Sequence, residues 1–579
     1  MTVDNATITQ RTEGQTVPER FAATVGDHAD RVALRWKDGD EFAEWTFGDY
    51  AERACRVAAG LGALGVERGD RVVLMMRNRP EFHVADMGAL LCGATCISIY
   101  NSSAPEQIEY LAGHCEAKVA IVEDIGFLER LLKVRGELPA LRDVVVMDDP
   151  DGLAPSDVRS WSDLGSADPV DLAVTSRTAQ PTDLATVIYT SGTTGPPKGV
   201  MLDHANVCWT IESLRQSLEH VAQPGRRLVS YLPMAHIAER MTSHYQQAAI
   251  GYEVTTCPDA SQVASYFASV HPEILFGVPR IWEKLHAGIM AMVGADAAKQ
   301  QAFEAALASG DDRVLAPVRG ALGLDACVSA ITGAAPIPAA IIEFFRSLGV
   351  PLAEIYGMSE SSGPMTFDAV EVRPGTVGRA IPGCEVLLAD DGEVVCRGGN
   401  VFRGYLNDPE RTAEALDDEG WLHSGDIGEL DDDGYLNIVD RKKELIITAG
   451  GKNISPANLE AALKVFPLIG QACVIGDGRP FVSALVVLDP EVAPMWAKQQ
   501  GIEESALAAL AEHPKVIAEV ERSVAEANLQ FSKVEQVKKV RVLGEEWIPD
   551  SEELTPTMKL KRRGVHTKYA DEIEALYRR

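Results

Sequence analysis

The sequence predicts an α/β protein of two parts: a large N-terminal domain over residues 1–440 and a small α+β C-terminal domain over residues 441–579. Helical and strand-like segments alternate through the first half, which indicates mixed or parallel sheets flanked by helices in several layers. From Gly392 the pattern changes to short strands separated by turns, which predicts a short-stranded subdomain. A compact, independent pattern begins beyond Asp440 and predicts the small domain.

The first elements alternate between the helical and the strand period. Residues 46–61 carry apolar side chains at helical spacing, and the run RVVLMM at 71–76 follows as a buried strand. A helix over 81–91 and a strand over 95–100 repeat the pattern. The stretch 149–181 is rich in Asp, Ser and Pro, so we expect it to be a surface excursion of the large domain.

The predicted small domain has its own helix signals. Ser455 is a capping residue, and Pro456 after it suits the first helical position, so a helix is expected to continue over 457–465. Residues 482–488 predict a strand, and two more helical stretches follow.

Composition narrows the function classes. Hydrophobic residues make up 46% and charged residues 24%, as in globular proteins. The net charge of −31 disfavours general affinity for nucleic acid and a purely electrostatic membrane anchor. The polar N-terminus does not look like a signal peptide, no transmembrane segment is visible, and the ten cysteines are scattered singly. We therefore expect a cytoplasmic protein with reduced, mostly buried thiols.

The strongest local signal is the string YTSGTTGPPKG at 189–199, which follows an apolar strand over 184–189 and precedes a helix near Asp203. Four Ser/Thr hydroxyls and three glycines in eleven residues can surround an anion, and Lys198 adds positive charge. The spacing is not that of a P-loop, and composition alone fits a plain loop equally well. The full string resembles the phosphate-binding signature of the adenylate-forming superfamily, which includes acyl-CoA synthetases, adenylation domains and firefly luciferase. The resemblance assigns the phosphates to Thr190, Ser191, Gly192, Thr193, Thr194 and Lys198.

Further motifs of that superfamily follow in order. The string YLPMAH at 231–236 is similar to its second core motif and implies that His236 lies beside the carboxylate substrate. TGAAP at 332–336 resembles the adenine-side loop, and YGMSE at 356–360 resembles the next motif. The resemblance assigns the adenine, the phosphates and Mg²⁺ to these loops: Gly333, Ala334, Ala335, Tyr356, Gly357 and Ser359 for the nucleotide, and Glu360 with Thr194 for the metal.

The C-terminal half continues the resemblance. EVVCRGGNVFRGYLNDPE at 393–410 and WLHSGD at 421–426 look like the two following motifs, which places Asp426 on the ribose hydroxyls. DRKKE at 440–444 resembles the hinge motif, with Arg441 on the ribose side and Lys443 at the pivot of a mobile small domain.

The string LTPTMKLK at 554–561 resembles the motif that ends in the catalytic lysine, here Lys559. Lys561 is the register alternative, because Met558 stands where the motif usually has glycine. Gly450 and Gly451 are implied to face coenzyme A.

Two strings point to one branch of the superfamily. PMAHIAER at 233–240 and GVPRIWEK at 277–284 resemble the long-chain fatty acyl-CoA synthetases. The resemblance implies an enzyme with ATP, Mg²⁺ and coenzyme A as cofactors, which converts a fatty acid to acyl-CoA, AMP and pyrophosphate through an acyl-adenylate. A homodimer and a peripheral contact with membranes stay open.

Three alternative functions remain. An enzyme that adenylates another acid or loads a separate carrier protein would share these motifs, although no phosphopantetheine-type serine motif follows residue 565. A luciferase-like oxygenase would also share them. A non-catalytic nucleotide-binding protein is disfavoured, because Lys559, Glu360 and the hydroxyl-rich loop are all present.

Overall fold

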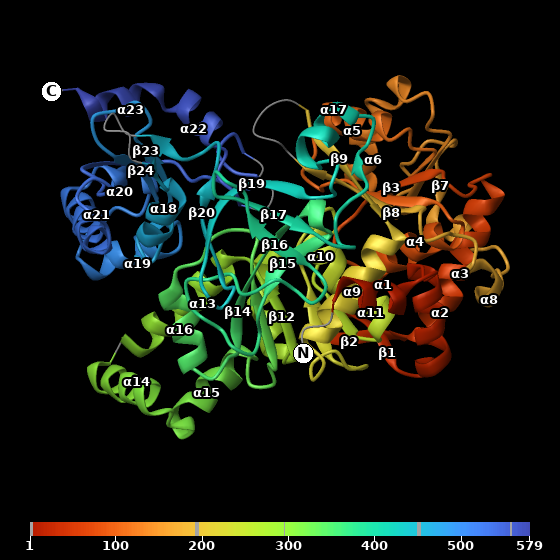
Figure 1. The fold of residues 1–579 in the computed structure, drawn as a ribbon, viewed down its shortest axis with the longest axis horizontal. Coiled ribbons are helices and arrows are strands. Elements are labelled where there is room, and N and C mark those ends of the chain that lie inside the picture. The colour runs from red at the N-terminus through yellow and green to blue at the C-terminus, as the bar shows by residue number, and fades with distance from the viewer. Residues whose placement is uncertain are drawn as a thin grey trace.

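The computed structural model of the chain describes residues 4–190, 196–294, 296–447, 453–549, 551–555 and 558–578. Figure 1 shows the C-terminal residues, in blue, gathered at one corner of the molecule beside the remainder of the chain. We call residues up to 440 the N-terminal unit and residues from 441 the C-terminal unit. α/β architecture, as predicted, is present throughout the described residues.

An eight-stranded sheet in the N-terminal unit has the strand order β18-β9-β8-β4-β3-β5-β6-β7. Its strands are β3 (Arg71–Met75), β4 (Thr95–Ser98), β5 (Val119–Asp124), β6 (Asp143–Asp148), β7 (Arg159–Ser160), β8 (Leu184–Thr190), β9 (Lys198–Asp203) and β18 (Gly404–Tyr405). The expected surface excursion at 149–181 supplies the edge strand β7 and two short helices.

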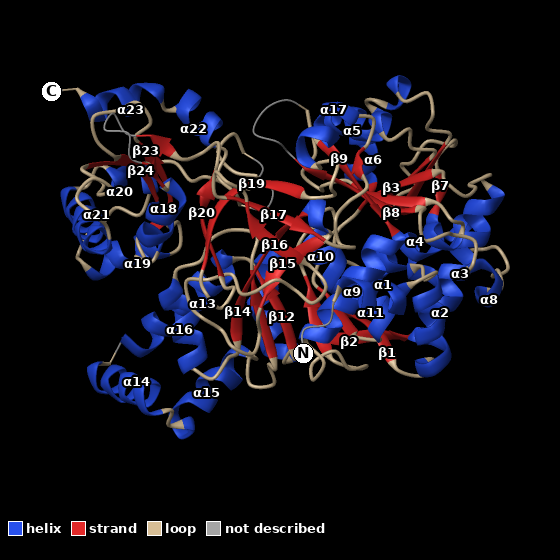
Figure 2. Ribbon diagram, in the orientation of Figure 1, coloured by secondary structure: helices blue, strands red, loops and turns tan. Residues whose placement is uncertain are grey.

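Helices cover both faces of this sheet. The side chains of β3 are therefore buried on both faces, which explains its continuous run of apolar residues. Val72 and Leu74 pack in a cluster with α3 (Phe47–Ala63) and α4 (Pro80–Leu91). Val73 and Met75 point to the opposite face and pack with α5 (Pro105–His114) and α6 (Ile125–Leu132). Figure 2 shows these two pairs of helices on opposite sides of the strands.

Three four-stranded sheets complete the N-terminal unit, with orders β10-β11-β1-β2, β12-β13-β14-β15 and β16-β17-β19-β20. The strands are β1 (Val32–Asp38), β2 (Glu41–Thr46), β10 (Arg227–Ser230), β11 (Glu253–Thr256), β12 (Ile274–Gly277), β13 (Ser329–Thr332), β14 (Leu352–Met358), β15 (Gly363–Phe367), β16 (Glu385–Leu388), β17 (Glu393–Arg397), β19 (Leu422–Leu430) and β20 (Leu436–Arg441). The third sheet holds the short strands β17, β19 and β20 expected after Gly392, but it also includes β16, which precedes Gly392. Gly434 turns between its last two strands with φ of 82°.

The remaining helices of the N-terminal unit cover these sheets. They are α1 (Asn5–Thr12), α2 (Val17–His28), α7 (Trp161–Leu164), α8 (Leu172–Thr175), α9 (His204–Ser217), α10 (Ile237–Glu239), α11 (Gln246–Ile250), α12 (Val263–Val270), α13 (Pro279–Gly294), α14 (Ala297–Ser309), α15 (Asp312–Leu322), α16 (Ala339–Ser347) and α17 (Pro409–Ala415). Short turns of tighter or wider helix lie in this unit at Arg135–Glu137, Arg240–Tyr245, Ala260–Gln262 and Ser359–Ser361, and another, Asn528–Gln530, lies in the C-terminal unit.

The C-terminal unit is built on the sheet β23-β24-β25 and a two-stranded ribbon β21-β22. Its elements are β21 (Ile446–Ile447), β22 (Asn453–Ile454), α18 (Pro456–Lys464), β23 (Ile469–Ile475), β24 (Ser483–Leu488), α19 (Val492–Gln499), α20 (Leu507–Ala511), α21 (Pro514–Ala527), β25 (Lys539–Leu543), α22 (Arg562–Lys568) and α23 (Ala570–Tyr577). Ser455 caps α18 as predicted, accepting from the Asn458 amide at 3.1 Å. Three helices, not two, separate β24 from β25.

The thiols are shielded from solvent, as the sequence predicts. All ten cysteines are free; Cys92 and Cys327 are half-buried, and the other eight are buried. Burial raises the pKa of Cys55 to about 11 and that of Cys92 to about 12. No helix within the described residues is long and apolar enough to cross a membrane.

Candidate active site

A cavity of about 2240 Å³ is lined by residues of both units. His236, Tyr356 and Asp426 come from the N-terminal unit, and Lys559 comes from the C-terminal unit. A pocket for one small ligand is typically about 300–1,000 Å³. The cavity therefore has room for a nucleotide and a second substrate together.

The described ends of the hydroxyl-rich string belong to two paired strands. β8 and β9 pair antiparallel, with Thr190 opposite Lys198, so the strand β9 stands where we expected only a loop before the helix. Asp203 ends β9 and caps α9 through the Asn206 amide at 2.8 Å. Thr190 and Lys198 line the cavity. Ser191, Gly192, Thr193 and Thr194 lie outside the described residues.

Glu360 is tied to the same strand pair. Lys198 Nζ donates to Tyr405 Oη at 3.1 Å, and Tyr405 Oη donates to Glu360 Oε1 at 2.7 Å. Glu360 is buried at the wall of the cavity. No group of three or more His, Cys, Asp or Glu suited to a metal occurs among the described residues. One carboxylate fits Mg²⁺ that is held mainly by substrate phosphates.

The adenine-side loop follows β13, next to β14. Ala334 and Ala335 line the cavity, and Ala334 has a φ of 71°, in the left-handed region. A Cβ on Gly333 would lie 2.9 Å from the carbonyl oxygen of Ile355, so only glycine fits there. Tyr356, Gly357 and Ser359 line the same cavity, which places a flat aromatic ring near these backbone groups.

Asp426 and Arg441 face each other across the pair β19–β20. Tyr356 Oη donates to Asp426 Oδ2 at 2.7 Å, and Arg441 Nε lies 3.5 Å from Asp426 Oδ1. Burial raises the pKa of Asp426, and the charge of Arg441 opposes that shift. Asp426 is thus a shielded acceptor, of the kind that binds ribose hydroxyls in other nucleotide sites.

His236 is neutral in this environment. It begins the short helix α10, where its Nδ1 accepts from the Ala238 amide at 3.2 Å. Burial, and to a lesser extent the charge of Lys559, lowers the pKa of His236 to about 3. A neutral imidazole beside the cavity can donate or accept one hydrogen bond without adding charge.

Lys559 reaches the cavity from a tight turn of the C-terminal unit. The turn is closed by the Thr555 amide donating to the Lys559 carbonyl at 2.8 Å and by a bridge between Leu554 and Leu560. Burial and the charge of Arg441 lower the pKa of Lys559 to about 8, while Asp426 and Glu360 oppose the shift. Lys443, which the motif predicts to be the hinge, also lines the cavity, and Gly450 and Gly451 lie outside the described residues.

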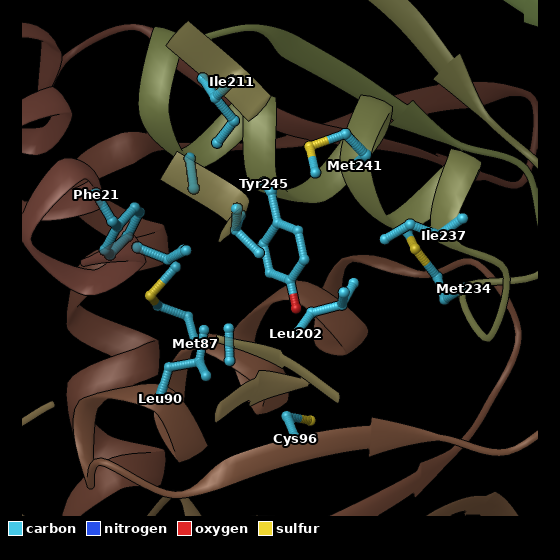
Figure 3. Close-up of a cluster of buried hydrophobic side chains, with 14 of the residues drawn as sticks. Phe21, Met87, Leu90, Cys96, Leu202, Ile211, Met234, Ile237, Met241 and Tyr245 are labelled. Carbon is cyan, nitrogen blue, oxygen red and sulfur yellow. The ribbon is translucent and has the colours of Figure 1, made fainter. Parts of the chain in front are cut away.

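Part of the cavity lining is apolar, and we call this part the apolar arm. It is lined by Leu214 of α9, by Leu218 directly after that helix, and by Met241, Tyr252 and Phe276. Figure 3 shows Ile237 and Met241 beside Met234, in the core that also holds Ile211 and Tyr245. The cavity lining thus offers both charged and apolar side chains, as a substrate with a carboxylate head and a hydrocarbon chain requires.

A profile of the AMP-binding enzymes matches residues 21–406, and that of their C-terminal domain matches residues 443–579. The chain belongs to the AMP-binding enzyme family. The resemblance to adenylate-forming enzymes stated from the motifs is thereby confirmed.

Relatives of this AMP-binding enzyme are similar over nearly their whole length. Long-chain-fatty-acid--CoA ligase FadD15 of Mycobacterium bovis is 35% identical, covering 97% of this chain and 99% of the relative. Long-chain-fatty-acid--CoA ligase ACSBG2 of Xenopus laevis is 35% identical, covering 97% and 84%. The crystal structure of the anthranilate CoA ligase AuaEII has the same fold, with a TM-score of 0.75 and 20% identity over 97% of this chain and 98% of that one.

Three features of the site were missed from the sequence. Tyr405, which joins Lys198 to Glu360, was part of a quoted motif but received no role. Glu354, two residues before Tyr356, lines the cavity, and burial raises its pKa to about 8. Arg240 of the PMAHIAER string is fully buried, where it pairs with Asp86 and donates to Tyr245 Oη at 2.8 Å.

The backbone at Met558 supports Lys559 over Lys561 as the register. Met558 has a φ of 65°, the left-handed conformation that suits the glycine found there in similar motifs. We expect Met558→Gly to keep adenylate formation within about twofold, whereas Met558→Val should lower it, because β-branched residues are strained at positive φ. Acid-dependent ATP–pyrophosphate exchange and thermal unfolding measure the two effects. Equal loss in both variants would contradict the assignment.

Proposed function

We propose that this AMP-binding enzyme is an AMP-forming ligase that joins a long-chain fatty acid to coenzyme A. The observation that carries the proposal is the shared cavity, where Lys559 of one unit meets His236, Glu360 and Asp426 of the other and part of the lining forms the apolar arm. The relatives named as long-chain-fatty-acid--CoA ligases support the substrate class.

In the first half-reaction the carboxylate attacks the α-phosphate of ATP, and pyrophosphate leaves. The protein aligns the two reactants and neutralises charge that develops between them. We assign Lys559 to the carboxylate and the α-phosphate, and residues 190–194 with Lys198 to the departing phosphates. Ala334, Ala335 and Tyr356 flank the adenine, Asp426 and Arg441 bind the ribose, and His236 lies beside the acid.

Glu360, with Thr194, would hold Mg²⁺, which would neutralise phosphate charge when bound. Glu360 itself is kept in place by the hydroxyl of Tyr405, whose contact leaves one carboxylate oxygen for the metal.

In the second half-reaction the coenzyme A thiol attacks the acyl carbon and expels AMP. A free thiol with a pKa of about 8.5 is a few per cent thiolate at pH 7, so little activation is needed. We assign residues 1–440 and 441–579 to two domains that pivot at Lys443 between the steps, exchanging Lys559 for the loop with Gly450 and Gly451. We place the enzyme in the cytoplasm.

A panel of acids from acetate to long-chain fatty acids, with benzoate as an aromatic control, tests the substrate class. Each CH₂ buried in the apolar arm should add roughly 0.8 kcal/mol, or about fourfold in kcat/KM per carbon, until the arm is filled. Thioester formation with ATP and coenzyme A is the measurement. A panel in which acetate or benzoate outperforms every fatty acid would refute the long-chain assignment.

A further inference from the structure

Two ion pairs join the units far from the hinge. Arg280 Nη2 pairs with Asp489 Oδ2, and Lys284 Nζ lies 2.8 Å from Glu491 Oε1. Arg280 and Lys284 are four residues apart on α13, so they lie on one helix face. Asp489 and Glu491 belong to the turn between β24 and α19. Figure 1 shows α13 beside the part of the C-terminal unit that carries α19.

The Arg280–Asp489 pair is the better shielded of the two. The side chains of Arg280 and Asp489 are 19% and 6% exposed, against 47% and 68% for Lys284 and Glu491. Exposed pairs contribute little and are screened by salt. Loss of Arg280 leaves the shielded Asp489 without this partner, and loss of Asp489 leaves Arg280 only Glu283, 3.8 Å away on the same helix. Either change penalises this arrangement of the units.

The pair acts on Lys559 through a rigid connection. Asp489 directly follows β24, and the β24 residues Leu485 and Val487 pack in one cluster with Leu554, Met558 and Leu560, which surround Lys559 in the chain. The orientation of β24 therefore sets where Lys559 points. On the other side, Arg280 lies in the first turn of α13, just after Phe276, which lines the apolar arm and accepts from Tyr231 Oη at 2.9 Å.

A second attachment point is needed because the hinge alone permits rotation. Near the hinge, Ser455 Oγ donates to Asp440 Oδ2 at 2.7 Å, which fixes one point of the C-terminal unit. A body held at one point still turns about it. A contact remote from that point fixes the angle, and the Arg280–Asp489 pair is such a contact.

We propose that Arg280 and Asp489, with Lys284 and Glu491 beside them, form a latch that positions Lys559 for adenylation and opens before thioester formation. The latch gives a role to the GVPRIWEK string, which the proposed chemistry leaves unused. It rests on the proposed function, because only a two-step ligase needs Lys559 in place for one step and away for the next. Arg280 and Asp489 are positioning residues that act through Lys559.

The test separates the two half-reactions in Arg280→Ala and Asp489→Asn. Asparagine keeps an oxygen that can cap α19, as Asp489 Oδ1 does for the amides of Glu491 and Val492 at 3.0 Å, and removes only the charge. Each variant should slow acid-dependent ATP–pyrophosphate exchange about three- to tenfold. Thioester formation from supplied acyl-adenylate and coenzyme A should be unchanged or faster.

Three controls make the result decisive. The double variant should be no slower than the slower single one, because both changes break one contact. Arg280→Lys keeps the charge and should recover part of the exchange rate. Arg313→Ala removes a 90% exposed arginine paired with Asp311 on the same unit and should change neither half-reaction.

Equal slowing of both half-reactions, multiplying effects in the double variant, or full exchange in Asp489→Asn would overturn the latch. Asp489→Asn decides the matter if Arg280→Ala fails to fold. Absence of exchange in the unaltered protein with every acid of the panel would instead refute the proposed function, so the two failures are distinguishable.

Discussion

Lys559→Ala is expected to lower adenylate formation by at least about a hundredfold while leaving thioester formation from supplied acyl-adenylate nearly intact. Loss of a single preorganised charge-stabilising group typically costs about 10²–10³ in rate. Lys559 contributes only while the small unit presents it to the cavity, so the second half-reaction should not depend on it. Acid-dependent ATP–pyrophosphate exchange and thioester formation measure the two steps.

Lys561→Ala is the matched control. Lys561 Nζ donates to the Ser551 carbonyl at 2.8 Å within the same unit, so its loss should spare the first step. Selective loss of adenylation in Lys561→Ala, or equal slowing of both steps in Lys559→Ala, would contradict the assignment.

Lys559 should also set an upper pH limit to the activity. Lys559 must be protonated to neutralise phosphate charge, and its pKa in the free enzyme is lowered to about 8. kcat/KM for ATP should therefore fall about tenfold per pH unit above pH 8, because this ratio reports the free enzyme. In Lys559→Arg the arginine stays charged at all these pH values. The pH profile of kcat/KM for this variant should therefore lack the alkaline fall, whatever the absolute rate of the variant.

Glu360→Ala is expected to slow adenylation roughly a hundredfold and to raise the Mg²⁺ concentration needed for half-maximal rate. The variant removes the buried carboxylate that we assign to the metal, and with it much of the charge neutralisation at the phosphates. A titration with Mg²⁺ at fixed ATP measures both effects.

Tyr405→Phe serves as the control for Glu360. It removes the hydroxyl that donates to Glu360 Oε1 and accepts from Lys198 Nζ, but keeps the carboxylate. Its rate should fall by no more than about tenfold, with a smaller shift in Mg²⁺ dependence. Unchanged rate and metal dependence in Glu360→Ala would return Glu360 to the role of an ordinary loop acid.

Local signals explain which parts of the fold were predictable. β3 carries a continuous apolar run, Val72 to Met75, because the sheet is covered on both faces, so the sequence alone indicates burial. The cap of α18 is equally local, since Ser455 bonds an amide three residues away. The strand β9 was missed because Lys198, Gly199 and Asp203 are poor strand formers, and pairing with β8 overrides that preference.

The site was predictable only where a motif carries its own chemistry. Asp426 and Arg441 could be placed by motif, although their contact depends on the pairing of β19 with β20. The link from Lys198 to Tyr405 joins residues 207 positions apart and depends on β18 adding to the edge of β9. Likewise, no pattern in the sequence indicates that Arg280 meets Asp489.

The shielded cysteines have a consequence for an enzyme that makes activated acyl groups. A mixed anhydride acylates whichever thiolate reaches it first, and the protein carries ten thiols of its own. Eight of these thiols are buried and two are half-buried, and burial raises the pKa of Cys208 and of Cys473 to about 12. The protein scaffold therefore offers few accessible thiols to its own intermediate. A colorimetric disulfide reagent should likewise react slowly with the folded protein, so that the disappearance of the coenzyme's sulfhydryl can be followed continuously in its presence.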